Sequence, residues 1–229
     1  MDISGLQKTT LLDYPGKVAC TVFLSGCNLR CPFCHNASLV ERPVPPQMSE
    51  AEFFAFLGKR RGLLDGVCVT GGEPTLRPDL PEFLAKIRAM GFMVKLDTNG
   101  TNPALLEQLM GEGLVDYLAM DIKGAPSRYR EICGGIDVLE PVKQSAALLM
   151  SGGIAYEFRT TCVHPFHDPA SMADIGEWIA GAEQYYLQGF VDSGDLIGTG
   201  MTALTKEEMN ALRSAVLTYI PNTRLRGVS

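Results

Sequence analysis

Apolar residues along this chain gather in short runs that alternate with segments of helical periodicity. The runs cover residues 18–24, 67–70, 93–97, 117–122, 155–162 and 185–190. Helices are expected near residues 50–59, 79–90, 103–111, 137–151, 170–183 and 205–218. Strands that alternate with helices at this spacing indicate βαβ units. The pattern therefore predicts an α/β fold around a mostly parallel sheet of six strands.

Local signals mark where some of these elements begin. Ser49 and Glu52 form a capping box at the start of the first helix. A turn at residues 13–16 leads into the first strand, and the proline-rich stretch 42–46 is a stiff connection. We expect one domain over residues 1–229. An N-terminal segment (1–17) and a C-terminal helix and tail (193–229) flank its strand-rich part (18–192).

Composition narrows the class of protein. Hydrophobic residues make up 46% of the 229 residues, enough to bury a full core without disulfides. Seven mostly isolated cysteines indicate a reducing compartment, and a net charge of −6 disfavours a nucleic-acid-binding protein, which would need a basic face. The sequence carries neither a signal-peptide pattern nor an apolar run near the roughly 18 residues of a membrane span. We expect a cytoplasmic protein that binds neither nucleic acid nor membrane.

Three cysteines follow the first apolar run at the spacing C-x3-C-x2-C: Cys27, Cys31 and Cys34. Soft thiolates are the ligands of iron–sulfur clusters and of zinc. Three protein ligands leave one position open, as in catalytic rather than structural metal sites. We interpret the motif as the site of a [4Fe–4S] cluster with one iron free to bind a small molecule. The alternative is a zinc site completed by His35 or by a distant residue. Completion by His35 is disfavoured, because it adjoins Cys34 and adjacent residues seldom both reach one tetrahedral ion.

Polar or glycine-bearing motifs follow four successive predicted strands. After the cysteine loop come Gly71-Gly72-Glu73-Pro74, then Asp97-Thr98-Asn99-Gly100, then Asp121-Ile122-Lys123. Barrel-type α/β folds place their active sites at the carboxyl ends of the strands. We therefore expect these motifs to meet around one site.

The run 6–36, LQKTTLLDYPGKVACTVFLSGCNLRCPFCHN, resembles the start of radical S-adenosylmethionine (radical SAM) proteins. The C-x3-C-x-aromatic-C motif is specific for that superfamily. The flanking DYPGK and CHN resemble the activating proteins of anaerobic ribonucleoside-triphosphate reductases, which are relatives of the pyruvate formate-lyase activating enzyme. The resemblance covers most of the chain and weakens towards the C-terminus. It implies a partial (β/α)6 TIM-like barrel whose chemistry is carried by a cluster on Cys27, Cys31 and Cys34.

The resemblance also implies contacts with SAM. In the cysteine loop, Phe33 matches the aromatic position near the adenine, and His35 and Asn36 are expected to shape the same pocket. Asp121 and Lys123 match a motif of the fourth strand, in which the lysine meets the SAM carboxylate.

Two further segments match parts of the family pattern to different degrees. Gly71, Gly72 and Glu73 match a segment that binds the methionine amino group, where glycines permit close approach and the carboxylate accepts from an ammonium. Gln188 stands about where the pyruvate formate-lyase type has a histidine. An amide there still has hydrogen-bonding capacity towards a ribose hydroxyl.

A monovalent cation is a further cofactor that the resemblance implies. Asp97, Thr98, Met120 and Asp121 match the positions that line such a site in the pyruvate formate-lyase activating enzyme. All the donors would be oxygens, as a hard cation prefers.

Other candidate residues are expected to have structural roles. His164 and His167 form an H-x-x-H pair on a proline-containing loop, where no helix aligns them for a metal. Arg159 is expected to point into the barrel and to contact SAM or neutralise a carboxylate. The isolated cysteines are expected to be small core residues: Cys20, Cys68, Cys133 and Cys162.

The function implied by the resemblance is that of a radical SAM activase. Such an enzyme cleaves SAM reductively at its cluster and uses the 5′-deoxyadenosyl radical to form a glycyl radical on a partner. The implied partner is an anaerobic ribonucleoside-triphosphate reductase, and the electron donor a low-potential flavodoxin or ferredoxin. The alternatives are activation of another glycyl radical enzyme, a radical SAM reaction on a small molecule, and a non-catalytic metal-binding module.

Overall fold

The computed structural model describes residues 1–41 and 45–228. Its main sheet has eight strands in the order β10–β9–β8–β7–β6–β5–β3–β2, and only β2 runs antiparallel to its neighbour. Their bounds are β2 Gly5–Thr10, β3 Ala19–Leu24, β5 Gly66–Gly71, β6 Met93–Thr98, β7 Tyr117–Asp121, β8 Ala155–Cys162, β9 Tyr185–Gly189 and β10 Thr223–Arg226. A separate antiparallel pair joins β1 (Asp2–Ile3) to β4 (Met48–Ser49).

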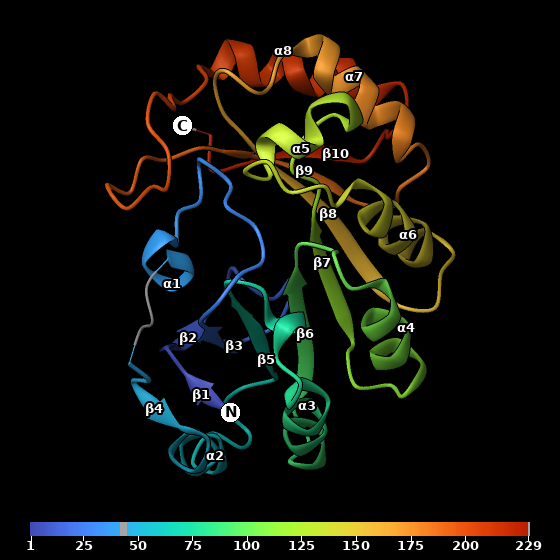
Figure 1. Ribbon diagram of the computed structural model, residues 1–229. Helices are drawn as coiled ribbons and strands as arrows, with labels where there is room; N and C mark the ends of the chain where they lie inside the picture. The colour runs from blue at the N-terminus through green and yellow to red at the C-terminus, as the bar shows by residue number, and fades with distance from the viewer. Residues whose placement is uncertain (42–44, 229) are drawn as a thin grey trace.

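Most of the helices cover the outer face of this curved sheet, whereas the first lies beside the loop after β3 (Figure 1). Their bounds are α1 Ala37–Glu41, α2 Glu50–Gly58, α3 Leu80–Ala89, α4 Pro103–Gly111, α5 Tyr129–Ile132, α6 Leu139–Met150, α7 Pro169–Trp178 and α8 Lys206–Leu217, with short 3-10 turns at Pro74–Leu76 and Pro126–Arg128. Among the residues described, no helix is both long and apolar enough to cross a membrane.

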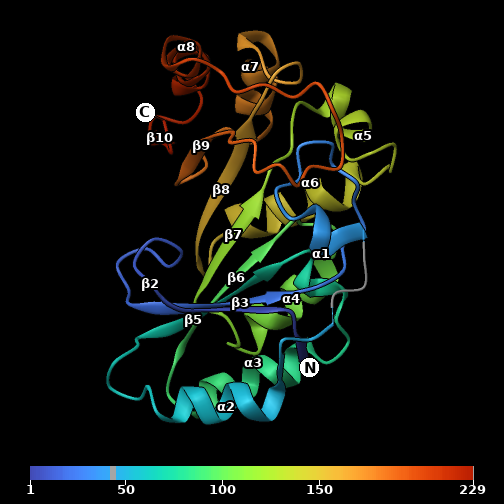
Figure 2. The same ribbon diagram turned by 90° about the vertical axis from the view of Figure 1, so that its left-hand side faces the viewer.

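The six predicted strands are the six central ones of the sheet, and the partial TIM-like barrel is confirmed. The sequence pattern missed the two edge strands, because β2 lies in the expected N-terminal segment and β10 in the expected C-terminal tail. Figure 2 shows β2 and β3 together at one edge of the sheet, with β9 and β10 at the other. Part of the predicted proline-rich connection, residues 42–44, lies outside the described residues.

Helix ends follow local signals. The capping box of α2 is present, since Ser49 N donates to Glu52 Oε2 at 2.8 Å and Glu52 N donates to Ser49 Oγ at 3.3 Å. Helix α7 ends at Trp178 and not at 183 as predicted. Gly181, with a φ of +85°, takes the left-handed conformation that stops a helix, and its N donates to Tyr219 O.

Alternation along the strands separates the core from the barrel interior. On β7, Leu118 and Met120 are fully buried in the main apolar core, whereas Asp121 lines a cavity inside the barrel. The cavity lies at the carboxyl ends of the parallel strands, where the predicted motifs are found.

Candidate active site

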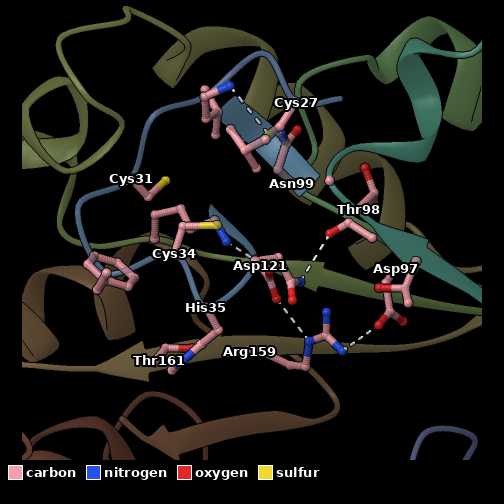
Figure 3. A pocket seen from close by; sticks show the side chains of 18 of the residues that line it. Cys27, Cys31, Cys34, His35, Asp97, Thr98, Asn99, Asp121, Arg159 and Thr161 are labelled. Carbon is pink, nitrogen blue, oxygen red and sulfur yellow. Dashed lines mark hydrogen bonds and ion pairs between the residues drawn. The ribbon is translucent and has the colours of Figure 1, made fainter. Parts of the chain in front are cut away.

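The loop after β3 brings the three cysteines to this cavity. Cys27, Cys31 and Cys34 all line it (Figure 3). Cys34 N donates to Cys31 O at 3.0 Å, which closes a tight turn, and Leu29 N donates to Cys27 Sγ at 3.4 Å. The structure thus brings together the three thiols that the sequence predicts as ligands.

The electrostatic surroundings of the three thiols differ. Burial raises the pKa of Cys27 and of Cys34, because a weakly polar environment disfavours a thiolate. A hydrogen bond with the thiol of Cys133 lowers the pKa of Cys31 to about 7. Lys123 favours the thiolate at all three positions. Since the thiolate is the form that binds metal, this lysine supports metal binding by the loop.

The donor set fits a cluster better than a single ion. Within the described residues, no three His, Cys, Asp or Glu side chains are arranged to hold one metal ion. In a cluster, each cysteine binds its own iron, so the sulfur atoms need not converge on one point. His35 does not complete a zinc site with the cysteines but lies against Phe190, with ring centroids 5.4 Å apart.

The same cavity collects the residues predicted to bind SAM, together with Asp97 and Thr98 of the implied cation site. They come from the cysteine loop, from the ends of β5, β6 and β7, and from β9. Those that line the cavity are Phe33, His35, Asn36, Gly71, Gly72, Asp97, Thr98, Asp121, Lys123 and Gln188. Only Glu73 of the predicted set is not among the lining residues.

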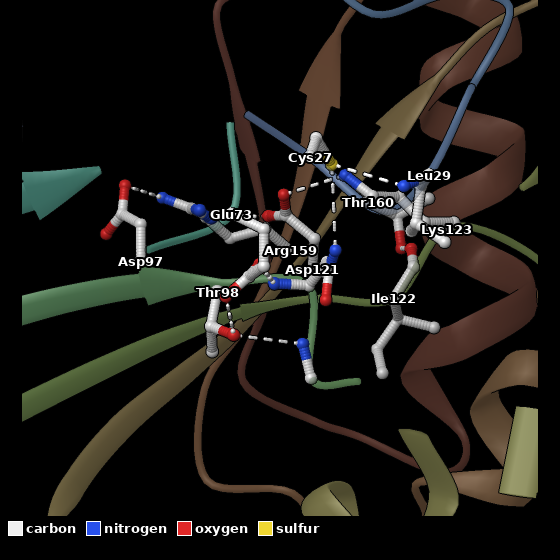
Figure 4. A network of polar contacts seen from close by, with 12 residues as sticks. Cys27, Leu29, Glu73, Asp97, Thr98, Asp121, Ile122, Lys123, Arg159 and Thr160 are labelled. Carbon is white, nitrogen blue, oxygen red and sulfur yellow. Dashed lines mark hydrogen bonds and ion pairs between the residues drawn. The ribbon is translucent and has the colours of Figure 1, made fainter. Parts of the chain in front are cut away.

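Charged side chains form a connected network on one wall of the cavity (Figure 4). Arg159, as expected, enters the barrel and bridges two carboxylates, with Nη1 3.0 Å from Asp97 Oδ2 and Nε 2.9 Å from Asp121 Oδ1. Lys123 Nζ lies 2.9 Å from Asp121 Oδ2, and Lys95 pairs with Asp97. Burial opposes ionisation of both carboxyls, but Arg159 and these lysines hold the pKa of Asp97 and Asp121 below the usual range.

The placement of Glu73 differs from the expectation that it accepts from the SAM ammonium. Its carboxylate is buried and accepts from Thr75 N (3.0 Å), Thr98 Oγ1 (2.9 Å) and Asn99 N (2.6 Å), with a further bond from Thr75 Oγ1. Burial raises the pKa of Glu73. The side chain therefore ties the end of β5 to the end of β6 beneath the cavity.

Gly71 and Gly72 lie against the backbone at the end of β3 and the start of the cysteine loop. Gly72 N donates to Leu24 O at 2.8 Å, and Glu73 N donates to Gly26 O at 2.7 Å. A Cβ at Gly72 would lie 2.1 Å from Gly26 O, and one at Gly71 would lie 2.1 Å from Leu24 O. Close approach is required here, as predicted for these glycines, but the group approached is the backbone of Leu24 and Gly26.

Three polar residues that sequence reasoning did not select connect β6 to the cysteine loop. Asn99 Nδ2 donates to Asn28 Oδ1, and Asn28 Nδ2 donates to Thr101 Oγ1, each at 2.9 Å. Thr101 Oγ1 donates to Asn99 Oδ1 at 2.7 Å, which closes the ring. Asn28 lies inside the cysteine motif and Asn99 directly follows Thr98, so adjacency to the motifs was the available signal.

The two histidines of the H-x-x-H pair make separate contacts. His164 is partly exposed and its Nε2 lies 3.2 Å from Glu208. His167 is buried, and its Nδ1 accepts from Val163 N at 3.1 Å while its Nε2 lies 3.0 Å from Lys123 O. Burial lowers the pKa of His167. This neutral ring supports the backbone that carries Lys123.

The cysteine loop, the glycines and the charged network together define a site that comparison with known proteins identifies. The family model described as "Radical SAM superfamily" matches residues 21–179. The chain belongs to the radical SAM superfamily. As a radical SAM enzyme, it uses a [4Fe–4S] cluster and S-adenosylmethionine.

Relatives of this radical SAM chain differ in how much of it they match. A provisionally named glycyl-radical enzyme activating enzyme of Methanocaldococcus jannaschii is 30% identical, over 99% of this chain and 96% of its own length. PqqA peptide cyclase of Methylorubrum populi is 33% identical over 53% of this chain and 32% of its own. Pyruvate formate-lyase-activating enzyme of Listeria monocytogenes is 34% identical over 53% of this chain and 52% of its own.

A solved structure shares the fold at low sequence identity. SuiB of Streptococcus suis superposes with a TM-score of 0.71 at 14% identity, covering 90% of this chain and 49% of SuiB. This chain therefore spans about half the length of SuiB, and the likeness at that identity concerns the fold alone.

Proposed function

We propose that this radical SAM enzyme is an activase that generates a glycyl radical on a partner enzyme. The observation that carries the proposal is the similarity to the Methanocaldococcus protein over nearly the whole length of both chains. PqqA peptide cyclase matches only 53% of this chain, with 32% of its own length, and SuiB shares the fold over 49% of its length. The chain thus matches the glycyl-radical relative as a whole and the other two only in part.

The partner that we propose is an anaerobic ribonucleoside-triphosphate reductase. Its support is the run 6–36, in which DYPGK and CHN flank the cysteine motif. In DYPGK, Tyr14 is buried and packs against Tyr117 with ring centroids 6.0 Å apart, and Asp13 accepts from Thr21 Oγ1. A low-potential flavodoxin or ferredoxin is the proposed electron donor.

The residues of the site bind and position the reactants. Cys27, Cys31 and Cys34 would hold the cluster, and Lys123, with Asp121 beside it, would meet the charged end of SAM. A reduced cluster bound there would supply one electron to SAM, whose cleavage to methionine and a 5′-deoxyadenosyl radical would provide the species that abstracts a hydrogen atom from a glycine Cα of the partner. No side chain of this chain needs to act as a general acid or base, because the chemistry transfers an electron and a hydrogen atom. The apolar wall around Phe33 keeps water away.

The experiment has two stages, both anaerobic. The enzyme is reconstituted with iron and sulfide, reduced, mixed with SAM, and assayed for 5′-deoxyadenosine by chromatography. Cys31→Ala should lose the product and most of the bound iron. Cys162→Ala, which removes a buried thiol away from the loop, should retain both. A folded Cys31→Ala that kept parental iron and product would contradict the assignment of the cluster ligands.

The second stage adds the reductase and uses electron paramagnetic resonance to look for a glycyl radical. A doublet that disappears when the radical glycine of the reductase is replaced by alanine supports the proposal. Product in the first stage without a radical on the reductase would refute the proposed partner, and a radical on another glycyl radical enzyme would reassign it. Turnover of a small molecule or peptide in place of either protein would refute the activase function.

A further inference from the structure

Lys95 is a buried lysine inside the barrel, with only 1% of its surface exposed. It lies two residues before Asp97 on β6, and alternate residues of a strand share a face. The structure accordingly pairs its ammonium with Asp97 Oδ1, and places the same Nζ 3.8 Å from Cys68 Sγ. Lysines are almost never fully buried without a charged partner, so this pairing explains how Lys95 is tolerated.

Each oxygen of the two cavity carboxylates has a cationic partner. Asp97 Oδ1 contacts Lys95 and Asp97 Oδ2 contacts Arg159. Asp121 Oδ1 contacts Arg159 and Asp121 Oδ2 contacts Lys123. Three cationic side chains therefore face two carboxylates. A further cation between the carboxylates would be repelled by these three side chains. It would also gain little attraction, because both carboxylates are already neutralised.

The other two residues of the implied cation site are also engaged elsewhere. Thr98 Oγ1 donates to Glu73 at 2.9 Å and accepts from Gly100 N at 3.1 Å. Met120 has no side-chain oxygen, and its main chain belongs to a strand that is paired on both sides, with Thr98 of β6 and Phe158 of β8. The residues present therefore do not fit a monovalent metal ion, which takes oxygen ligands.

We propose that Lys95 and Arg159 are built-in cations that take the place of a monovalent metal ion beside Asp97 and Asp121, so that SAM binding is independent of Na⁺ and K⁺. Lys95 is a positioning residue, because it acts on the cavity through Asp97. A tethered ammonium is present at every salt composition, whereas a metal ion must be taken from solution. In either case the cation offsets the cost of holding two ionised carboxylates next to each other inside the barrel.

The test compares NaCl, KCl and tetramethylammonium chloride at one ionic strength. Binding of radiolabelled SAM to the reconstituted, unreduced enzyme is measured by equilibrium dialysis, and the melting temperature of the full chain is measured in the same salts. The parent should give one dissociation constant and one melting temperature in all three. In tetramethylammonium, Lys95→Met should bind SAM about tenfold more weakly, the equivalent of one charged hydrogen bond. Na⁺ or K⁺ should restore its binding in a saturable manner.

Matched variants distinguish an effect of the positive charge of Lys95 from an effect of the shape of its side chain. Lys95→Arg keeps the charge and should be insensitive to the choice of salt, as should Lys143→Met, which removes an exposed lysine of α6. If Lys95→Met does not fold, Lys95→Gln keeps a donor towards Asp97 without the charge and allows the same comparison.

Three outcomes would overturn the proposal. One is a saturable effect of Na⁺ or K⁺ on the parent, which needs no variant. Another is a folded Lys95→Met that matches the parent in every salt. The third is weakened SAM binding that no salt restores, which would leave Lys95 as a packing residue. None of these readouts involves the reductase, so the inference stands or falls separately from the proposed function.

Discussion

Replacement of Glu73 by glutamine distinguishes a structural carboxylate from one that binds SAM directly. The side chain accepts four hydrogen bonds, from two backbone amides and two hydroxyls. Glutamine has the same shape but presents one amide NH2 where glutamate presents an oxygen. The hydroxyls are able to rotate and accept from it, whereas the backbone N–H groups of Thr75 and Asn99 are not. In either orientation, one buried backbone donor loses its acceptor.

The size of the effect follows from that loss. An unsatisfied buried donor costs about 1–3 kcal/mol. Burial raises the pKa of Glu73, which means that the ionised carboxylate is unfavourable at this position. Glutamine carries no charge, so the substitution removes this penalty and offsets part of the cost of the lost hydrogen bond. We expect Glu73→Gln to lower the free energy of unfolding by about 1–2 kcal/mol, a fall of roughly 2–8 °C in melting temperature for a chain of this size.

The assay is thermal unfolding of the iron-free chain without SAM, followed by circular dichroism. Glu107→Gln, which removes an exposed carboxylate on α4, serves as the control and should melt with the parent. SAM binding by reconstituted Glu73→Gln should also weaken, because the ends of β5 and β6 are no longer held together. If Glu73→Gln melted at the parental temperature and yet lost SAM binding, Glu73 would contact SAM directly and the structural argument would be wrong.

Two further predictions concern the neighbours of the cavity. Gly72→Ala would place a Cβ 2.1 Å from Gly26 O, so we expect a loss of about 1–3 kcal/mol in chemical denaturation and reduced iron retention. Gly111→Ala, where a Cβ meets nothing within 4 Å, should be neutral or slightly stabilising, and equal effects of the two would contradict the clash. The pKa of His167 is lowered by burial, so the unfolded chain binds more protons, and stability should fall as pH drops below about 6.5. His167→Phe should be less stable at pH 8 and should lose this part of the pH dependence; an unchanged pH profile in unfolding experiments would assign it to other groups.

The sequence predicted the elements that carry local signals. Apolar runs bounded by helical segments located all six central strands, and the cysteine spacing located the loop that lines the cavity. Strand β10 escaped because Thr223–Arg226 is short and contains two arginines. Its place is set by tertiary contacts, since Arg226 pairs with the buried Glu157 and stacks on Tyr186. No periodicity in four residues reports such a contact.

The direction of a side chain is a second thing that a motif does not reveal. The position of Gly71-Gly72-Glu73 after a strand predicts that this segment lies at the cavity. It does not reveal whether the carboxylate of Glu73 points into the cavity or away from it. That depends on donors supplied by β6, which lies 25 residues further along the chain at Thr98. Lys95 was likewise not selected from the sequence, because this residue lies within the apolar run 93–97. Only the arrangement of the strands in the barrel shows that its side chain points inward.

These contacts also show why the strand-end motifs occur together. Glu73 holds Asn99, Asn99 bonds to Asn28 inside the cysteine loop, and Gly72 lies against the backbone of that same loop. His167 in turn holds the backbone at Lys123. Each motif therefore supports a neighbour as well as facing the cavity. The lining of the cavity is consequently held by one connected network, and disturbance of a residue beneath the cavity should be transmitted to the cysteines.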